Sequence, residues 1–170
     1  MVLALFLICA ITAGVVAVVN AQTVDKIAEN LEGEIRGSIE GMFGEGVSYE
    51  TLENIPADAV AIYRITRDGK DSYCVNLNSS GFGGDINMLV AIGSDGGVVG
   101  VRVVSHSETP GLGSRATEDD FLSRFVGKIF GESVDSIVGA TISSKAIKSG
   151  VNKAYRILIE AGLHPEVYTK

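Results

Sequence analysis

The sequence predicts an α+β fold, in which helices pack on a mainly antiparallel twisted sheet behind one N-terminal transmembrane helix. Residues 2–19 are almost wholly apolar and carry no charge. Residues 59–104 alternate β-favouring segments with turn-forming residues, a pattern typical of two hairpins. From Ala146 to Ile159 apolar residues recur in adjacent pairs four apart, which is one stripe of an amphipathic helix. A chain of 170 residues has room for one domain of ordinary size and an appendage.

Composition excludes several classes of function. The chain has 14 Lys and Arg against 21 Asp and Glu, a formal charge of −7. Nucleic acid is therefore not an expected partner, because phosphate backbones require clustered positive charge. Cys9 lies in the apolar segment and Cys74 far from it, so no disulfide framework is predicted, and neither has partners at metal-ligand spacing. We expect no metal site.

The apolar N-terminal segment has three interpretations besides a buried core helix, which its uniform apolarity disfavours. Its length is near the lower limit for a membrane-spanning helix. A cleaved signal peptide would fit the small residues Val19 and Ala21, but no Lys or Arg precedes the apolar run. A lipoprotein signal would need a small residue before Cys9, where Ile8 stands. The third interpretation is a retained transmembrane anchor.

A second helix and a connector are expected next. Thr23 or Asp25 can cap a helix in which an isoleucine or leucine recurs every four residues from Ile27 to Ile39. Glycines interrupt this helix on another face. Residues 42–56 read as an irregular connector with one short strand.

Two hairpins follow the connector. Residues 59–65 and 72–77 flank the turn Arg67-Asp68-Gly69-Lys70, and residues 88–92 and 98–104 flank a turn at 94–97. Between the hairpins, the glycines of residues 80–85 are typical of a loop or bulge.

The segment after the second hairpin contains a turn and a short helix. Pro110 fixes φ and Gly111 permits a left-handed residue, so residues 109–112 are predicted to form a type II turn. Such a turn can bring backbone amides close to a planar ring while Leu112 covers an apolar part of that ring. Residues from Thr117 to 120 then cap a short helix that carries Phe121.

Residues 135–144, at the start of the last helix, are rich in hydroxyl side chains. Thr141, Ser143 and Ser144 lie where hydroxyls cap free backbone N–H groups and where the positive end of the helix dipole attracts anions. A phosphate would be well placed there. By itself, the pattern is more typical of an ordinary helix cap than of a phosphate site.

Two motifs together identify a family. Glu108-Thr109-Pro110-Gly111-Leu112-Gly113 and Asp135-x-x-x-Gly139-Ala140-Thr141-x-Ser143 resemble the FMN-binding domain of the G subunit of Rnf electron-transport complexes. The C subunit of the sodium-pumping NADH:quinone reductase shares this domain. The resemblance spans roughly residues 23–163 and includes the glycine-rich segment, with Phe82 in place of tyrosine. Val138 stands where the family usually carries Ser or Thr.

The resemblance implies a covalent cofactor. In this family a separate flavin transferase esterifies the threonine of the Gly-Ala-Thr motif to the phosphate of FMN, which carries over to Thr141. The other expected cofactor-binding residues lie in the motifs and the glycine-rich segment: Gly139, Ala140, Ser143, Ser144, Glu108, Thr109, Gly111, Leu112, Gly83 and Gly84.

The resemblance also implies a place in the cell and a function. It favours the retained anchor at residues 2–19, in the inner membrane, with an FMN-binding domain at residues 23–170 on the extracytoplasmic side. The expected function is electron transfer within an ion-translocating Rnf-type complex. Its partners would be the other subunits, the flavin transferase and the lipid bilayer. No residue is predicted to act as an acid, base or nucleophile, so any translocase activity would belong to the complex.

Two alternatives stay open at this point. One is a stand-alone flavinylated extracellular electron carrier. The other is a membrane-anchored interaction domain without flavin, in which both glycine motifs are only turns.

Overall fold

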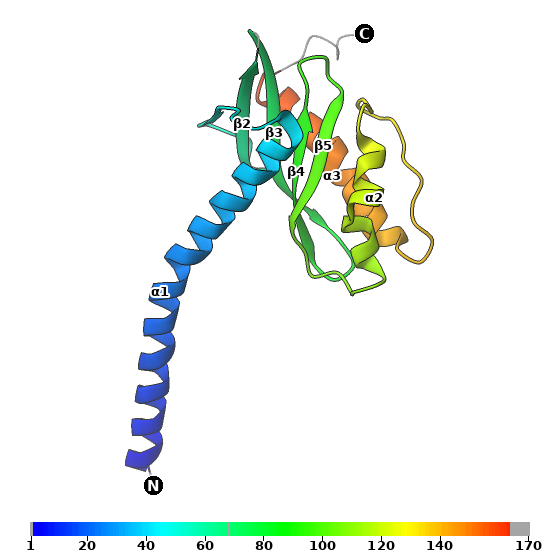
Figure 1. Cartoon of the computed structure of the whole chain (residues 1–170). Coiled ribbons are helices and arrows are strands. Elements are labelled where there is room, and N and C mark those ends of the chain that lie inside the picture. Colours follow the sequence, from blue (N-terminus) through cyan, green and yellow to red (C-terminus); the bar gives the residue numbers. More distant parts are fainter. Residues whose placement is uncertain (1, 68, 164–170) are drawn as a thin grey trace. The chain divides into compact units, whose positions relative to one another are not determined.

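The computed structural model describes residues 2–67 and 69–163 of the chain (Figure 1). Its contacts divide the chain into two compact units, Met1–Gly37 and Ser38–Lys170. Helix α1 (Val2–Phe43) contributes to both units. Asp68 of the first predicted turn and residues 164–170 of the predicted domain lie outside the described residues.

Helix α1 is one continuous helix of 42 residues. The expectation of a separate helix that begins at Thr23 or Asp25 is therefore wrong. The Thr23 hydroxyl does not cap a new helix, because it donates to the carbonyl of Val19 at 2.7 Å, one turn back. No glycine or proline occurs between residues 15 and 32, so nothing in this stretch interrupts the helix.

One stretch of α1 is long and apolar enough to cross a membrane. It covers Leu5–Thr23, 19 residues with a mean hydropathy of 2.1, and none of it is buried within the structure. This stretch overlaps the predicted anchor at residues 2–19 and extends it toward the C-terminus.

Five antiparallel strands form one sheet in the order β1-β2-β3-β4-β5. The strands are β1 (Tyr49–Thr51), β2 (Ala59–Arg67), β3 (Lys70–Ser80), β4 (Asp85–Ile92) and β5 (Val98–Ser105). Both predicted hairpins and the short connector strand are confirmed. The strands β3 and β4 also pair directly, with Ser80 opposite Asp85, so the glycine-rich segment is a tight turn. The sheet is therefore a simple meander.

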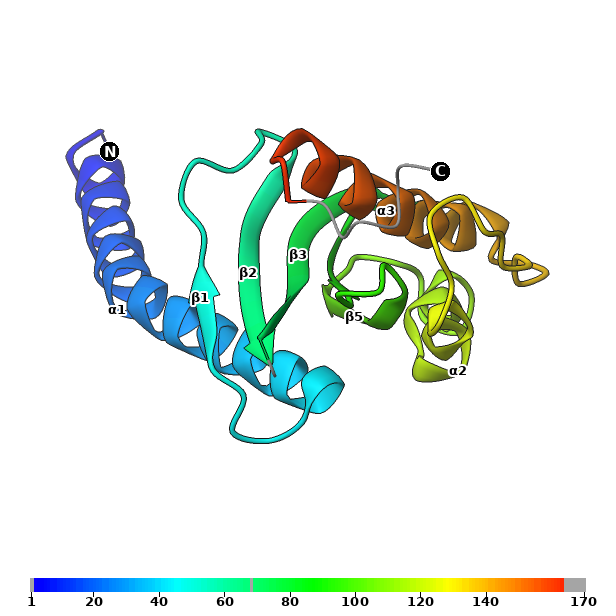
Figure 2. The ribbon, with the colours of Figure 1, turned by 90° about the horizontal axis from the view of Figure 1, so that it is seen from above.

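Helix α3 (Thr141–Glu160) covers one face of the sheet, over β3 and β4, while the short helix α2 (Asp119–Leu122) lies beside β5 (Figure 2). The 3₁₀ turns η1 (Gly113–Thr117) and η2 (Ser123–Phe125) flank α2. Thr117 does not cap α2, because its hydroxyl donates to the Ser114 carbonyl and Glu118 occupies the cap position.

The apolar stripe predicted on the last helix forms one side of the core. Its members from Ala146 to Leu158 are buried, whereas Ile159 is 38 % exposed and Ile157 is buried instead. They pack against the inward side chains of the central strands: Val75, Leu77, Ile86, Met88, Val90 and Ile92. This packing fixes α3 along the sheet.

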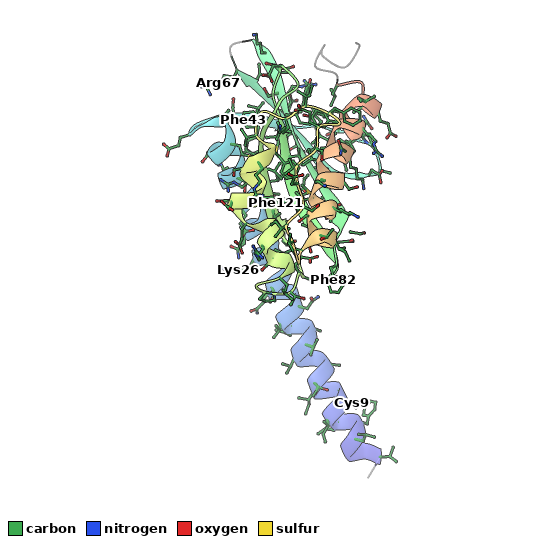
Figure 3. All side chains as sticks on the ribbon, turned by 90° about the vertical axis from the view of Figure 1, so that its right-hand side faces the viewer. Cys9, Lys26, Phe43, Arg67, Phe82 and Phe121 are labelled. Atoms are coloured by element: carbon green, nitrogen blue, oxygen red, sulfur yellow. The ribbon has the colours of Figure 1, made fainter. Side chains whose placement is uncertain are left out.

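The last turns of α1 belong to the second unit. Ile39 is fully buried, and the side chain of Met42 lies where a Cβ on Gly100 of β5 would be 2.7 Å from its Cγ. The Arg67 guanidinium donates to the carbonyl of Phe43 at 2.9 Å, at the end of the sheet where β2 meets β3 (Figure 3). Cys74 is buried, and burial raises the pKa of its thiol.

Candidate functional site

Three segments far apart in the sequence meet at one end of the sheet. The turn at residues 81–84 joins β3 to β4 there, and Figure 3 shows Phe82 at the opposite end from Arg67. Strand β5 ends at Ser105 opposite Asn87, so residues 108–113 begin at the same end. The Ser79 hydroxyl donates to the Ala146 carbonyl at 2.7 Å, which brings the first turns of α3 to this end as well.

These segments enclose a pocket of about 340 Å³. Its volume lies within the range of small-molecule sites, which are mostly apolar with a few placed polar groups. No charged side chain is among its lining residues, which are Phe82, Thr109, Leu112, Gly113, Gly139, Ala140, Thr141, Ile142 and Ser143. The pocket therefore suits a ligand with a large apolar or aromatic part.

The N-terminus of α3 opens onto this pocket without a side-chain cap. Thr141 is the first residue of the helix and is exposed, and Ala140 occupies the cap position with no capping hydrogen bond. The expected caps are wrong for the two serines. The Ser143 hydroxyl donates to Glu108, and the Ser144 hydroxyl accepts from the Ile137 N–H at 3.1 Å. The backbone N–H groups of the first turn are thus left for an external acceptor, at the positive end of a 20-residue helix.

The predicted turn at residues 109–112 is present. The Leu112 N–H donates to the Thr109 carbonyl at 3.2 Å, and Gly111 has a φ of +74° at the third position, as a type II turn requires. Ser114 supports the turn, since its hydroxyl accepts from the Gly111 N–H at 2.9 Å. Thr109 and Leu112 face the pocket, whereas Gly111 does not line it.

Glu108 lies buried behind the pocket, 4 % exposed. One carboxylate oxygen accepts from the backbone N–H groups of Phe82 at 2.8 Å and Gly83 at 3.1 Å, and the other accepts from the Ser143 hydroxyl. Burial alone would raise the pKa of this carboxyl. The hydrogen bonds from Ser143, Gly83 and Phe82 outweigh burial and hold the pKa below its usual value.

The predicted cofactor-binding residues divide into two groups in the structure. Those that line the pocket are Gly139, Ala140, Thr141, Ser143, Thr109 and Leu112. Those that lie around it without lining it are Ser144, Glu108, Gly111, Gly83 and Gly84. The second group contributes hydrogen bonds and turns that support the wall of the pocket, by which we mean its lining residues.

Three lining residues were not among the predicted cofactor-binding residues: Phe82, Gly113 and Ile142. Ile142 is 54 % exposed and Phe82 is 68 % exposed. Ile142 falls outside the buried stripe of its helix, and an apolar residue off the stripe is the signal that could have identified it.

Known proteins share this domain. Residues 81–156 match the family described as FMN-binding domain. The G subunit of the ion-translocating oxidoreductase complex of Shewanella oneidensis is 33 % identical over 181 residues, which cover 89 % of this chain and 84 % of that protein. The G subunit of the proton-translocating ferredoxin:NAD(+) oxidoreductase complex of Clostridium ljungdahlii is 39 % identical over 94 residues, 49 % of this chain and about half (51 %) of that protein.

A solved structure shares the fold. The crystal structure of the C subunit of the Na(+)-translocating NADH-quinone reductase from Parabacteroides distasonis matches with a TM-score of 0.51 and 26 % identity. The match covers 59 % of this chain and 61 % of that one.

Proposed function

The chain belongs to the family of G subunits of ion-translocating oxidoreductase complexes, and from this premise we propose that it carries FMN on Thr141 through a phosphoester bond. It is a membrane-anchored, FMN-binding electron-transfer subunit of an Rnf-type complex. The covalent bond, its acceptor and the side of the membrane that holds the domain are the proposed parts.

The observation that carries the proposal is the position of Thr141. Its side chain is exposed at the pocket, on the first residue of a helix whose first turn has no side-chain cap. A phosphate esterified to this hydroxyl would accept from free N–H groups and would lie at the positive end of the helix dipole. Thr109 also lines the pocket, but it belongs to a turn and has no helix N-terminus beside it.

The remaining lining residues fit the ring system of a flavin. Phe82, Leu112 and Ile142 offer apolar surface to such a ring. When bound, the isoalloxazine accepts and donates electrons singly or in pairs, and the protein supplies position, shielding and electrostatics. The residues of this chain therefore hold and orient the ring.

The charge of the pocket favours a covalent bond over simple binding. Among residues 2–67 and 69–163, no Lys or Arg lines the pocket, and the buried carboxylate of Glu108 lies behind it. A free FMN phosphate would meet no cationic side chain there, and helix N–H groups alone would have to hold it. Esterification to Thr141 removes part of the phosphate charge and prevents loss of the cofactor.

Formation of the bond requires a second protein. Condensation of a threonine hydroxyl with a phosphate releases water, which is unfavourable in water, so the flavin must come from an activated donor with a pyrophosphate bond. The Thr141 oxygen would form the new bond to phosphorus while the bond to the nucleoside monophosphate leaving group breaks and the hydroxyl proton is lost. In the family that the two motifs resemble, a separate flavin transferase carries out this step, so a flavin transferase is the proposed partner.

We place the domain on the extracytoplasmic side of the cell membrane. Covalent attachment of FMN is most useful on that side, because FMN that dissociated could not readily be replaced outside the cytoplasm. The other subunits of the complex are the proposed electron donor and acceptor, and they would remain with this chain through gentle detergent purification.

The test is to measure covalently bound flavin on variants of the protein with one substitution each. Thr141→Val should abolish the flavin fluorescence that survives denaturing gel electrophoresis, and mass spectrometry should no longer find the mass of one FMN less one water. The matched control is Thr109→Val, which alters the other threonine of the pocket and should keep the fluorescent band. A fluorescent band on Thr141→Val would refute Thr141 as the acceptor.

A further inference from the structure

Glu108 connects the three segments that line the pocket. Its own backbone begins the segment 108–113, one carboxylate oxygen accepts from Phe82 and Gly83 of the β3–β4 turn, and the other accepts from Ser143 in the first turn of α3. Each of these segments contributes lining residues, yet Glu108 itself does not line the pocket. The carboxylate is therefore a common anchor behind the wall.

Two glycines leave the space that this carboxylate occupies, and a third leaves space for the backbone just before it. A Cβ on Gly81 would lie 2.1 Å from one carboxylate oxygen, and a Cβ on Gly113 would lie 2.1 Å from the other. A Cβ on Gly83 would lie 2.1 Å from the carbonyl oxygen of Ser107, the residue before Glu108. None of the three has a positive φ, so their lack of a side chain serves space and not backbone conformation.

The carboxylate is held by hydrogen bonds and not by an ion pair. Among residues 2–67 and 69–163, no Lys or Arg forms a salt bridge with Glu108. Its donors are two backbone N–H groups, which have fixed directions, and the Ser143 hydroxyl, which can rotate toward its acceptor. The backbone N–H of Glu108 donates to His106 Nδ1 at 3.2 Å, which ties down the start of the segment too.

We propose that Glu108 is the positioning residue of the flavin site, whose carboxylate sets the spacing of the β3–β4 turn, the 109–112 turn and the start of α3 without touching the ring. This inference rests on the proposed function. It assigns the glutamate of the Glu-Thr-Pro-Gly motif to the support of the pocket lining from behind, and it explains why Gly81, Gly83 and Gly113 accompany it.

The first experiment needs no flavin. Phe82 and Gly83 are exposed residues, so we expect the protection of their amides from hydrogen exchange to come from Glu108. In full-length protein made without a flavin transferase, Glu108→Ala should speed exchange at both amides by about tenfold or more, because each loses a charged acceptor. The control is Glu118→Ala, the same change at an exposed glutamate whose side chain does not cap α2, which should leave both amides unchanged.

The second experiment uses flavin-loaded protein. Glu108→Ala should still carry flavin on Thr141, but the visible absorption spectrum should shift and the fluorescence anisotropy should fall, because the wall no longer holds the ring. Glu108→Gln keeps the shape and one carbonyl oxygen for Phe82 and Gly83, and its amide can donate to the Ser143 oxygen. It should therefore restore most of the spectrum and most of the amide protection.

The outcomes separate this inference from the proposed function. Absence of covalent flavin from the wild type would refute the proposed function, while the exchange result would stand. Unchanged exchange at both amides in Glu108→Ala, or an unchanged flavin spectrum despite lost protection, would overturn the positioning role. If Glu108→Ala does not fold, Glu108→Asp decides: its shorter side chain should lose the protection that Glu108→Gln keeps, and equal protection in the two variants would overturn the role.

Discussion

Glycine is required at positions around the pocket for two different physical reasons, and the sequence does not show which reason applies at which position. Gly111 and Gly139 have φ values of +74° and +85°, with nothing within 4 Å of an added Cβ, so backbone conformation requires glycine there. Gly113 has no positive φ, but a Cβ on it would meet the Glu108 carboxylate and, at 2.8 Å, the Ser143 hydroxyl. The motif Thr-Pro-Gly-Leu-Gly thus contains one glycine for the turn and one for the wall.

A pair of alanine variants tests this division. Gly111→Ala should lower the free energy of unfolding by about 1 kcal/mol, the cost of a left-handed alanine, and should leave the spectrum of bound flavin unchanged. Gly113→Ala should shift the spectrum, because the new methyl group displaces the Glu108 carboxylate. Chemical denaturation and visible absorption measure the two effects. Equal spectra for Gly113→Ala and the wild type would contradict the assignment of Gly113 to the wall.

Residue types at the site were predictable, but their contacts were not. The sequence indicated a helix start at Thr141 and the turn at 109–112 because both depend on local chemistry, whereas the choice of Thr141 as flavin acceptor came from the family resemblance. It could not indicate that Ser143 donates to Glu108, since 35 positions separate the two residues. The roles of Glu108 as an anchor and Phe82 as a lining residue come only from the meeting of three distant segments.

At the scale of elements, strand existence was predictable and strand length was not. β3 was expected over residues 72–77 but runs to Ser80, through polar residues with little β propensity. The Asn87 amide donates to the side-chain oxygens of Asn76 at 2.9 Å and Asn78 at 2.7 Å, which supports this polar end from the neighbouring strand. A partner strand thus overrides local preference, and the extension carries the turn at 81–84 out to the pocket.

The last turns of α1 make a testable contribution to the second unit. Ile39 is fully buried, so Ile39→Ala should lower the free energy of unfolding by about 2–5 kcal/mol, through lost burial and the cavity left behind. The matched control is Leu31→Ala, at a position on the same helix that is 42 % exposed, which should change stability by less than about 1 kcal/mol. Denaturant unfolding in detergent measures both. Similar losses in the two variants would show that the end of α1 does not belong to the core of the second unit.

At the scale of the whole molecule, the topology itself builds the site. In a meander of antiparallel strands, alternate connections lie at the same end of the sheet, so the β3–β4 turn and the segment after β5 must meet. The stripe on α3 then fixes which end of that helix reaches them. The hairpin and helix patterns were read correctly from the sequence, and this is why both motifs could be expected to converge even though their contacts were unknown.

The final prediction concerns attachment to the membrane. The apolar stretch Leu5–Thr23 contributes no residue to the pocket, so anchoring and flavin binding should separate. Full-length protein should stay in the bilayer fraction after carbonate washing. A transmembrane helix of this length anchors a protein in the bilayer far more firmly than a single covalently attached acyl chain would. A chain that begins at residue 24 should be soluble without detergent and still accept flavin from its transferase. N-terminal sequencing of the membrane-bound protein checks retention, and a mature chain that begins at Gln22 would indicate signal cleavage instead.

A thiol introduced on the domain tests on which side of the membrane the domain lies. Cys74 is buried and Cys9 lies within the membrane-spanning stretch, so an exposed thiol introduced by Glu118→Cys would be the reactive one. In intact spheroplasts an impermeant thiol reagent should label this variant and not the wild type, since we place the domain outside the cytoplasm. Labelling only after lysis would locate the domain, and with it Thr141, on the cytoplasmic side. Cytoplasmic FMN could then replace any that dissociates, and the proposed reason for a covalent bond would no longer hold.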